Sequence, residues 1–150
     1  MGQRVNRILC NIASSRLRNT QDFYTKWFDF KIIFESEWFI QLKSADGGFE
    51  IGIIEENNEL LPSSFRGRAK GLYLTLVIDD VDELYEGMKD SQVEIVQSPE
   101  DTFYGQRRYS FQLQICHFPL DSHFAFFILD FEEENKNSYQ FFPNGKPNQF

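Results

Sequence analysis

The chain has 150 residues, and 15 Lys and Arg against 23 Asp and Glu give it a formal net charge of −8. This length suits a single domain that buries roughly 70% of its unfolded surface, so folding needs no disulfide or metal ion. An acidic chain repels phosphate backbones and anionic lipids, which argues against nucleic acid and membrane surfaces as main partners. Hydrophobic residues make up 41% and charged residues 25%, a globular composition.

The cysteines and the N-terminal residues predict the cellular location. Cys10 and Cys116 stand in apolar stretches without zinc-binding spacing, which is typical of buried free thiols in a reducing compartment. Arg4 and Arg7 interrupt the short apolar run near the start, so it lacks a signal-peptide pattern. No window approaches the roughly 18 apolar residues of a membrane span. We therefore expect a cytoplasmic protein.

The first half of the chain predicts one helix among four strands. Aliphatic and β-branched residues favour a first strand, and aromatic residues at helical spacing follow it, with Asn19 or Thr20 as the expected N-cap. An Ala-Asp-Gly-Gly turn separates the last two strands. The expected elements are a strand at 4–13, a helix at 21–28, and strands at 30–35, 38–43 and 49–55.

The second half repeats this order after a polar linker at 57–70. A strong strand at 71–78 precedes Asp80, which is the expected N-cap of a helix with Glu83 three residues later. That helix carries an apolar stripe at Val81, Leu84, Tyr85 and Met88. Further strands are expected at 93–96, closed by Ser98-Pro99, and at 107–115 and 124–131.

The two halves align without gaps around their helices, 24–29 on 85–90. The sequence therefore predicts an α+β fold with two βαβββ modules, 4–56 and 71–131, within one domain at 1–131. Their curved mixed sheets would form a cup, and a concave surface is a candidate ligand site.

Three segments resemble the vicinal oxygen chelate superfamily of glyoxalase I, bleomycin resistance proteins and extradiol dioxygenases. They are the stretch 16–24 ending in Phe-Tyr, the strand and Asp-Asp-Val-Asp at 71–82, and Tyr-Gly-Gln-Arg-Arg-Tyr at 104–109. The order and spacing are closest to small bacterial glyoxalase/bleomycin-resistance-like members. The resemblance implies the same fold and a homodimer.

Metal-dependent members of this superfamily hold a divalent ion with His, Glu or Gln on the first strand of each module and a carboxylate on the last. The matching positions here hold Leu9, Tyr73 and, near the last, Phe126. Glu50 is the remaining residue of ligand type, and one carboxylate does not hold a catalytic metal. The two histidines, His117 and His123, lie in or near a turn. We expect neither a metal site nor another cofactor.

The C-terminal part departs from the family pattern. Pro-Leu-Asp-Ser at 119–122 replaces the usual Asp-Pro-x-Gly turn, and the polar residues 132–150 read as a flexible tail. A frame change in the coding sequence after about Ser110 would also account for the lost pattern, and would leave the last strand missing or improvised.

Strand alternation selects the candidate ligand contacts. Tyr73 and Thr75 are expected to face the cup, as is Glu50, for which Arg107 or Arg108 would be the cationic partner. Either arginine could instead bind an anionic ligand. Only one of Trp38 and Phe39 can line the cup, and residues 103 and 104 would form its rim. The predicted ligand-binding residues are Trp38, Glu50, Tyr73, Thr75, Phe103, Tyr104, Arg107 and Arg108.

These residues include no expected catalytic group, because the chain has no Gly-x-Ser-x-Gly motif and neither cysteine stands near a charged cluster. We expect metal-free binding of a flat or cationic small organic molecule, such as sequestration of an antibiotic or toxin. A metal-dependent lyase or dioxygenase of the same superfamily is the alternative, and a degenerate chain without ligand function is a third.

Overall fold

The computed structural model describes residues 2–66, 73–91, 93–103, 105–114 and 123–131. The chain divides into two compact units, the first made of Met1–Leu72 and Gln112–Phe124 and the second of Tyr73–Phe111 and Ala125–Phe150. None of the helices in the described ranges is long and apolar enough to cross a membrane. The predicted tail at 132–150 and the predicted turn at 119–122 lie outside the described residues.

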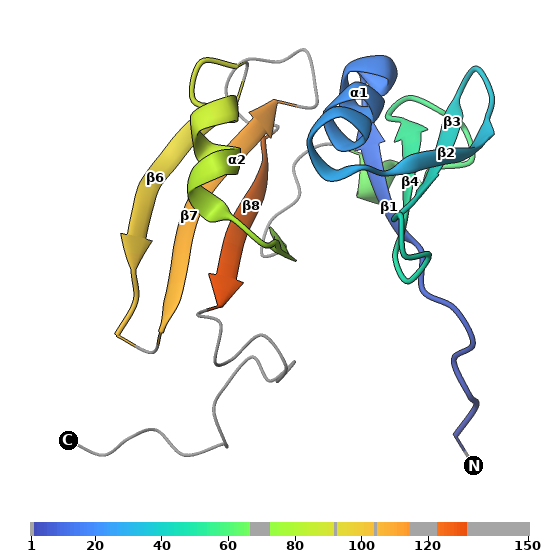
Figure 1. Ribbon diagram of the computed structural model, residues 1–150. Coiled ribbons are helices and arrows are strands. Elements are labelled where there is room, and N and C mark those ends of the chain that lie inside the picture. The colour runs from blue at the N-terminus through green and yellow to red at the C-terminus, as the bar shows by residue number, and fades with distance from the viewer. Residues whose placement is uncertain (1, 67–72, 92, 104, 115–122, 132–150) are drawn as a thin grey trace. The chain divides into compact units, whose positions relative to one another are not determined.

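The first unit contains a four-stranded mixed sheet with one helix against it (Figure 1). Its strand order is β1-β4-β3-β2, with β1 parallel to β4 and the other neighbours antiparallel. The predicted order of one strand, one helix and three strands is confirmed. The elements are β1 (Cys10–Ser14), α1 (Leu17–Phe28), β2 (Lys31–Glu35), β3 (Phe39–Lys43) and β4 (Glu50–Glu55).

Two boundaries in this unit differ from the prediction. The first strand begins at Cys10, because residues 2–8 are exposed and pair with no strand. The helix begins at Leu17, so neither Asn19 nor Thr20 is its N-cap. The N-cap residue is Arg16, whose side chain makes no capping hydrogen bond. Ser14 fixes the turn before the helix: its Oγ accepts from the Arg16 N–H at 2.9 Å and lies 2.9 Å from the buried Thr20 Oγ1.

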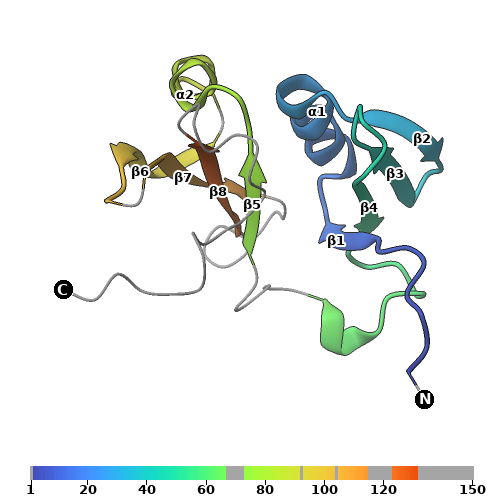
Figure 2. The same ribbon diagram turned by 60° about the horizontal axis from the view of Figure 1, so that its bottom comes forward.

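The second unit repeats the topology of the first. Its strand order is β5-β8-β7-β6, with β5 parallel to β8, so each strand occupies the place of its counterpart in the first sheet (Figure 2). This identity of order confirms the repeat of two βαβββ modules. The elements are β5 (Tyr73–Val77), α2 (Val81–Met88), β6 (Glu94–Asp101), β7 (Gln106–Gln114) and β8 (His123–Phe131). The short 3-10 helix η1 (Ser63–Phe65) lies in the predicted linker.

The start of α2 is confirmed, because the Asp80 side chain accepts a hydrogen bond from the Glu83 N–H at 2.9 Å. Strand β6 corrects the prediction that Ser98-Pro99 ends it, since it continues to Asp101. Proline lacks an N–H donor, and β6 tolerates it because it is the edge strand of its sheet. The predicted final strand is present and pairs with β5 over five residues.

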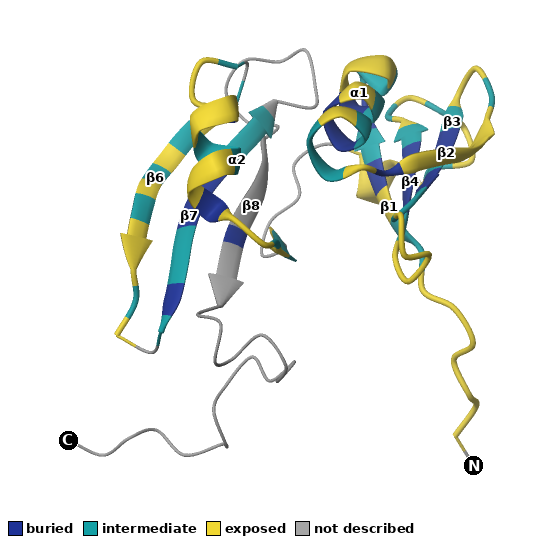
Figure 3. Cartoon of the chain, viewed as in Figure 1, coloured by how far each residue is buried: buried dark blue, intermediate teal, exposed yellow. Residues whose placement is uncertain are grey.

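Each unit has its own apolar core (Figure 3). In the first, the buried side chains of the sheet alternate along the strands and lie on the face that α1 contacts; they are Ile12, Ile40, Leu42, Ile51 and Ile53. In the second, the predicted stripe of α2 buries Val81 and Met88 completely. The Tyr109 hydroxyl donates to Met88 Sδ at 3.2 Å, and burial raises the pKa of Tyr109.

Candidate functional site

The sheet face turned away from α1 is the candidate binding surface of the first unit. Because side chains alternate, the positions between the buried isoleucines and leucines lie on this open face. The register joins them, with Gln41 opposite Gly52, Lys43 opposite Glu50, and Asn11 beside Gly52 on β1. Phe39 belongs to the same face, two residues before Gln41.

Gly52 makes room for its neighbours at the centre of this face. A Cβ atom added there would lie 2.0 Å from Asn11 Oδ1 and 2.8 Å from Phe39 Cε2. A side chain at position 52 therefore clashes with both residues. The absent side chain lets an amide and an aromatic ring lie directly against the backbone of β4.

Glu50 is a partly buried charged residue of this surface, with 12% of its side chain exposed. Its Oε2 accepts from Arg7 Nε at 2.9 Å and from Gln41 Nε2 at 2.7 Å. These contacts, the Arg7 hydrogen bond above all, lower the pKa of the Glu50 carboxyl. The carboxylate is therefore ionised at neutral pH and is held by a cation and an amide.

The cationic partner of Glu50 is Arg7, and not Arg107 or Arg108 as predicted from the sequence. Arg7 makes the ion pair, and Arg107 and Arg108 have carboxylate partners of their own in the second unit. Alternation also places Phe39 on the Glu50 face, whereas Trp38 directly precedes β3. The prediction that Trp38 contacts a ligand stays a prediction.

In the second unit, Tyr73 and Thr75 lie on the exposed face of β5, as predicted from alternation. Tyr73 and Val77 are 54% and 51% exposed, whereas Leu76 pairs in register with the fully buried Ile128. The prediction that Tyr73 and Thr75 contact a ligand stays a prediction.

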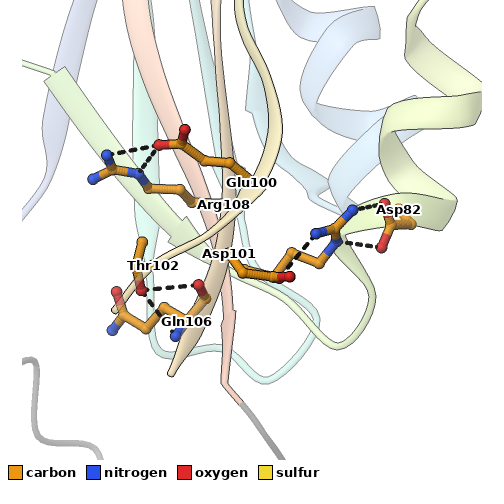
Figure 4. A network of polar contacts seen from close by, with 7 residues as sticks. Asp82, Glu100, Asp101, Thr102, Gln106 and Arg108 are labelled. Carbon is orange, nitrogen blue, oxygen red and sulfur yellow. Dashed lines mark hydrogen bonds and ion pairs between the residues drawn. The ribbon is translucent and has the colours of Figure 1, made fainter. Parts of the chain in front are cut away.

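Arg107 and Arg108 lie on opposite faces of β7. Arg107 shares a face with the buried Tyr109 and reaches α2, where its Nε lies 2.5 Å and its Nη2 2.9 Å from the Asp82 carboxylate. Its Nη1 also donates to Asp101 at 2.9 Å (Figure 4). Both carboxylates raise the pKa of Arg107. Arg107 thus ties α2 to the sheet, and the prediction that it contacts a ligand stays a prediction.

Arg108 donates to Glu100 Oε1 through Nε at 3.1 Å and Nη2 at 2.9 Å (Figure 4). The turn beside this pair is closed by a hydrogen bond of 2.7 Å from the Thr102 N–H to the Gln106 carbonyl. Phe103 stands at this turn with 90% of its surface exposed. Tyr104, the other predicted rim residue, lies outside the described residues.

The resemblance assigns the metal positions of metal-dependent members to Leu9 and Tyr73 of this chain. Leu9 directly precedes β1 and Tyr73 begins β5, and neither side chain offers the nitrogen or carboxylate donors that divalent ions take. Oε2 of Glu50 already accepts from Arg7 and Gln41. Within the described ranges, no three His, Cys, Asp or Glu side chains come together as a metal-binding group.

The comparisons with known proteins define the class to which this fold belongs. The family model of the Glyoxalase/Bleomycin resistance protein/Dioxygenase superfamily matches residues 4–121, and the chain is a member of that superfamily. No curated protein matches the chain in a sequence search.

Solved structures of the same class resemble the fold at low sequence identity. A family enzyme of the superfamily from Burkholderia phytofirmans PsJN is 22% identical, with a TM-score of 0.67 over 83% of this chain and 97% of that one. A superfamily member from Sphaerobacter thermophilus is 19% identical, with a TM-score of 0.61 over 81% and 94% of the two chains. TioX from Micromonospora sp. ML1 is 17% identical, with a TM-score of 0.58 over 83% and 95%. At these low identities, the TM-scores show a shared fold.

Two features of the open face escaped the sequence analysis. Arg7 precedes the first strand, so no periodicity connects it to Glu50, 43 positions later. The position of Gln41 could have been predicted, because it lies on the same face of its strand as Phe39 and its strand pairs with β4 through a short turn. Pairing 38–43 with 49–55 through that turn would have placed its amide beside Glu50.

Proposed function

We propose that this protein binds a small organic molecule without a metal ion, on the open sheet faces of its two modules. The observation that carries the proposal is the state of Glu50: its carboxylate is held by Arg7 and Gln41, and no cluster of further donors in the described residues surrounds it to complete the coordination of a metal ion. An apolar side chain at Leu9 and a phenol at Tyr73 stand where related metal-dependent proteins have donors. Sequestration of an antibiotic or toxin is the expected role.

The metal content of the purified protein tests this proposal. The full chain is purified without chelator, exposed in turn to Zn²⁺, Ni²⁺, Mn²⁺ and Fe²⁺, desalted and analysed by inductively coupled plasma mass spectrometry. We expect near-zero occupancy with all four ions. Stoichiometric occupancy that Glu50→Ala abolishes would overturn the proposal in favour of a metal-dependent lyase or dioxygenase.

Glu55→Gln is the matched control for Glu50 substitutions. Glu55 is the exposed last residue of the same strand, and its substitution by Gln changes the net charge by the same amount as a Glu50 substitution. Small organic molecules are then screened by thermal shift against the unmodified chain and both variants. We expect stabilisation by a ligand to depend on Glu50 and not on Glu55.

The assembly and location belong to the same proposal. We expect a cytoplasmic homodimer without a nucleic-acid or membrane partner, which follows from the acidic composition and from the superfamily resemblance. Light scattering coupled to size-exclusion chromatography measures the mass directly. A mass of about 36 kDa, twice that of the 17.8 kDa chain, is the expected result.

A further inference from the structure

We propose that Glu50 is the recognition site for a positively charged organic group and that Arg7 occupies this site as an internal competitor. The inference rests on the proposed binding function and names the chemistry of the ligand. When the ligand binds, the Arg7 guanidinium leaves the Glu50 carboxylate and the ligand cation replaces it.

The burial of Glu50 sets the requirement for a cation. With Arg7 in place, 12% of the side chain is exposed, so the carboxylate is partly shielded from water and a cationic partner stabilises it. Arg7 and Gln41 both donate to Oε2, while Oε1 accepts no hydrogen bond from the described residues. One oxygen is thus available to a ligand, and the other carries a cation that can be exchanged.

Arg7 can be exchanged because the segment that carries it is not part of the sheet. Residues 2–8 are exposed and precede β1, and in the described part of the chain no backbone hydrogen bond joins them to the strands. The Arg7 side chain is 58% exposed even while it contacts Glu50. Releasing it therefore costs one solvent-screened ion pair and breaks no secondary structure.

The charges around Glu50 favour a cation over an anion. A neutral group that displaced Arg7 would leave the partly buried carboxylate without a countercharge, and an anion would add a second negative charge beside it. Lys43 lies opposite Glu50 on β3 and lowers the pKa of the carboxyl further, but it adds no donor to its oxygens. A ligand cation would neutralise the Glu50 carboxylate as the Arg7 guanidinium does.

Aromatic rings on the same sheet face fit the rest of such a ligand. Phe39 lies on the Glu50 face, and its ring centroid is 6.3 Å from that of Phe34, which pairs with Gln41. Aromatic faces attract organic cations and also pack against flat apolar groups. An aromatic or alkyl ammonium compound therefore matches this face best.

The test uses three probes of similar shape and different charge on the full chain: phenethylammonium, 2-phenylethanol and 3-phenylpropionate. Their affinities are measured by NMR titration at neutral pH and low salt. We expect Arg7→Ala to bind phenethylammonium about fivefold more tightly than the unmodified chain, since the competitor is gone. Glu50→Gln should lose this binding, and the neutral and anionic probes should gain nothing from Arg7→Ala.

Arg4→Ala is the matched control, because Arg4 lies in the same segment, carries the same charge and makes no ion pair with the described residues. It should bind phenethylammonium as the unmodified chain does. Arg7→Met, which keeps an apolar stem without the charge, replaces Arg7→Ala should the latter fail to fold, as judged by its amide spectrum.

Three results would overturn the inference. One is equal phenethylammonium affinity in the Arg7 variant and the Arg4 control. Another is preferential binding of 3-phenylpropionate that Arg7→Ala abolishes, which would make Arg7 an anion receptor. The third is no binding of any probe to a folded Arg7 variant. In each case near-zero metal occupancy would leave the proposed function standing, whereas stoichiometric metal would remove the proposed function itself.

Discussion

Replacing Arg107 by Ala tests whether this residue is structural, as its contacts with α2 indicate, or belongs to a ligand site. The paired hydrogen bonds to Asp82 form a bidentate ion pair in which Arg107 is 32% and Asp82 55% exposed. Such a pair contributes about 1 kcal/mol after solvent screening. The single contact with Asp101, which is 80% exposed, adds about 0.3 kcal/mol.

Arg107→Ala should therefore lower the free energy of unfolding by about 1.3 kcal/mol, or the Tm by about 3–5 °C for a chain of this length. A double-mutant cycle with Asp82→Ala isolates the pair, because it cancels the separate effect of Asp82 at the start of α2. Urea denaturation followed by circular dichroism gives the four free energies. The expected coupling energy is about 1 kcal/mol.

The coupling energy between Arg107 and Asp82 should also decrease as the pH is lowered. The Arg107 hydrogen bond lowers the pKa of the Asp82 carboxyl in the folded state. The pair therefore contributes fully above the unfolded carboxyl pKa of about 3.9, and the contribution is lost as the pH falls through the lower, folded value. A coupling energy near zero at pH 7, or one that grows on acidification, would refute the assignment of Arg107 to this pair.

Three further substitutions test the packing around the candidate faces by urea denaturation. Gly52→Ala should cost about 1–3 kcal/mol by overpacking, and Asn11→Ala in that background should recover part of the loss; no recovery would contradict the close approach at β4. Asp80→Ala should cost about 1 kcal/mol through the lost cap, and an unchanged midpoint would show that α2 does not need it. Met88→Ala should cost about 2–5 kcal/mol, because it empties a fully buried site beside Tyr109; a loss under 1 kcal/mol would mean that the core closes the cavity.

The order of elements was predictable because it depends on local patterns. The apolar stripe of α2 and the Asp80 cap each involve residues within one helix, and the structure confirms both. The start of α1 was not predictable in the same way. Ser14 lies at the end of the preceding strand, and its hydroxyl contacts both the Arg16 N–H and the buried Thr20 hydroxyl. These contacts depend on the direction in which the chain passes from β1 into α1.

Ion pairs were harder to predict than elements, because they join residues far apart in sequence. Glu50 and Arg7 meet only once β1 lies parallel to β4, which places the start of the chain near the start of β4. A parallel pair of strands brings together segments that no turn connects, so a local pattern does not predict their contacts. The sequence predicted an arginine as the partner of Glu50, but the arginine is Arg7 and not Arg107 or Arg108.

The two arginines of β7 show what strand alternation predicts and what it leaves open. Tyr109, Phe111 and Leu113 are the apolar residues of this strand, and Tyr109 and Phe111 are fully buried. Since alternate residues share a face, Arg107 lies on the face of these residues and Arg108 lies on the other face, where Gln106 and Ser110 are also buried. A ligand that bound Arg108 would have to compete with Glu100, which accepts two hydrogen bonds from it. In the exchange that we propose at Glu50, the ligand cation competes with Arg7 in the same way, so in either unit the affinity for a ligand would depend on an ion pair that must first be broken.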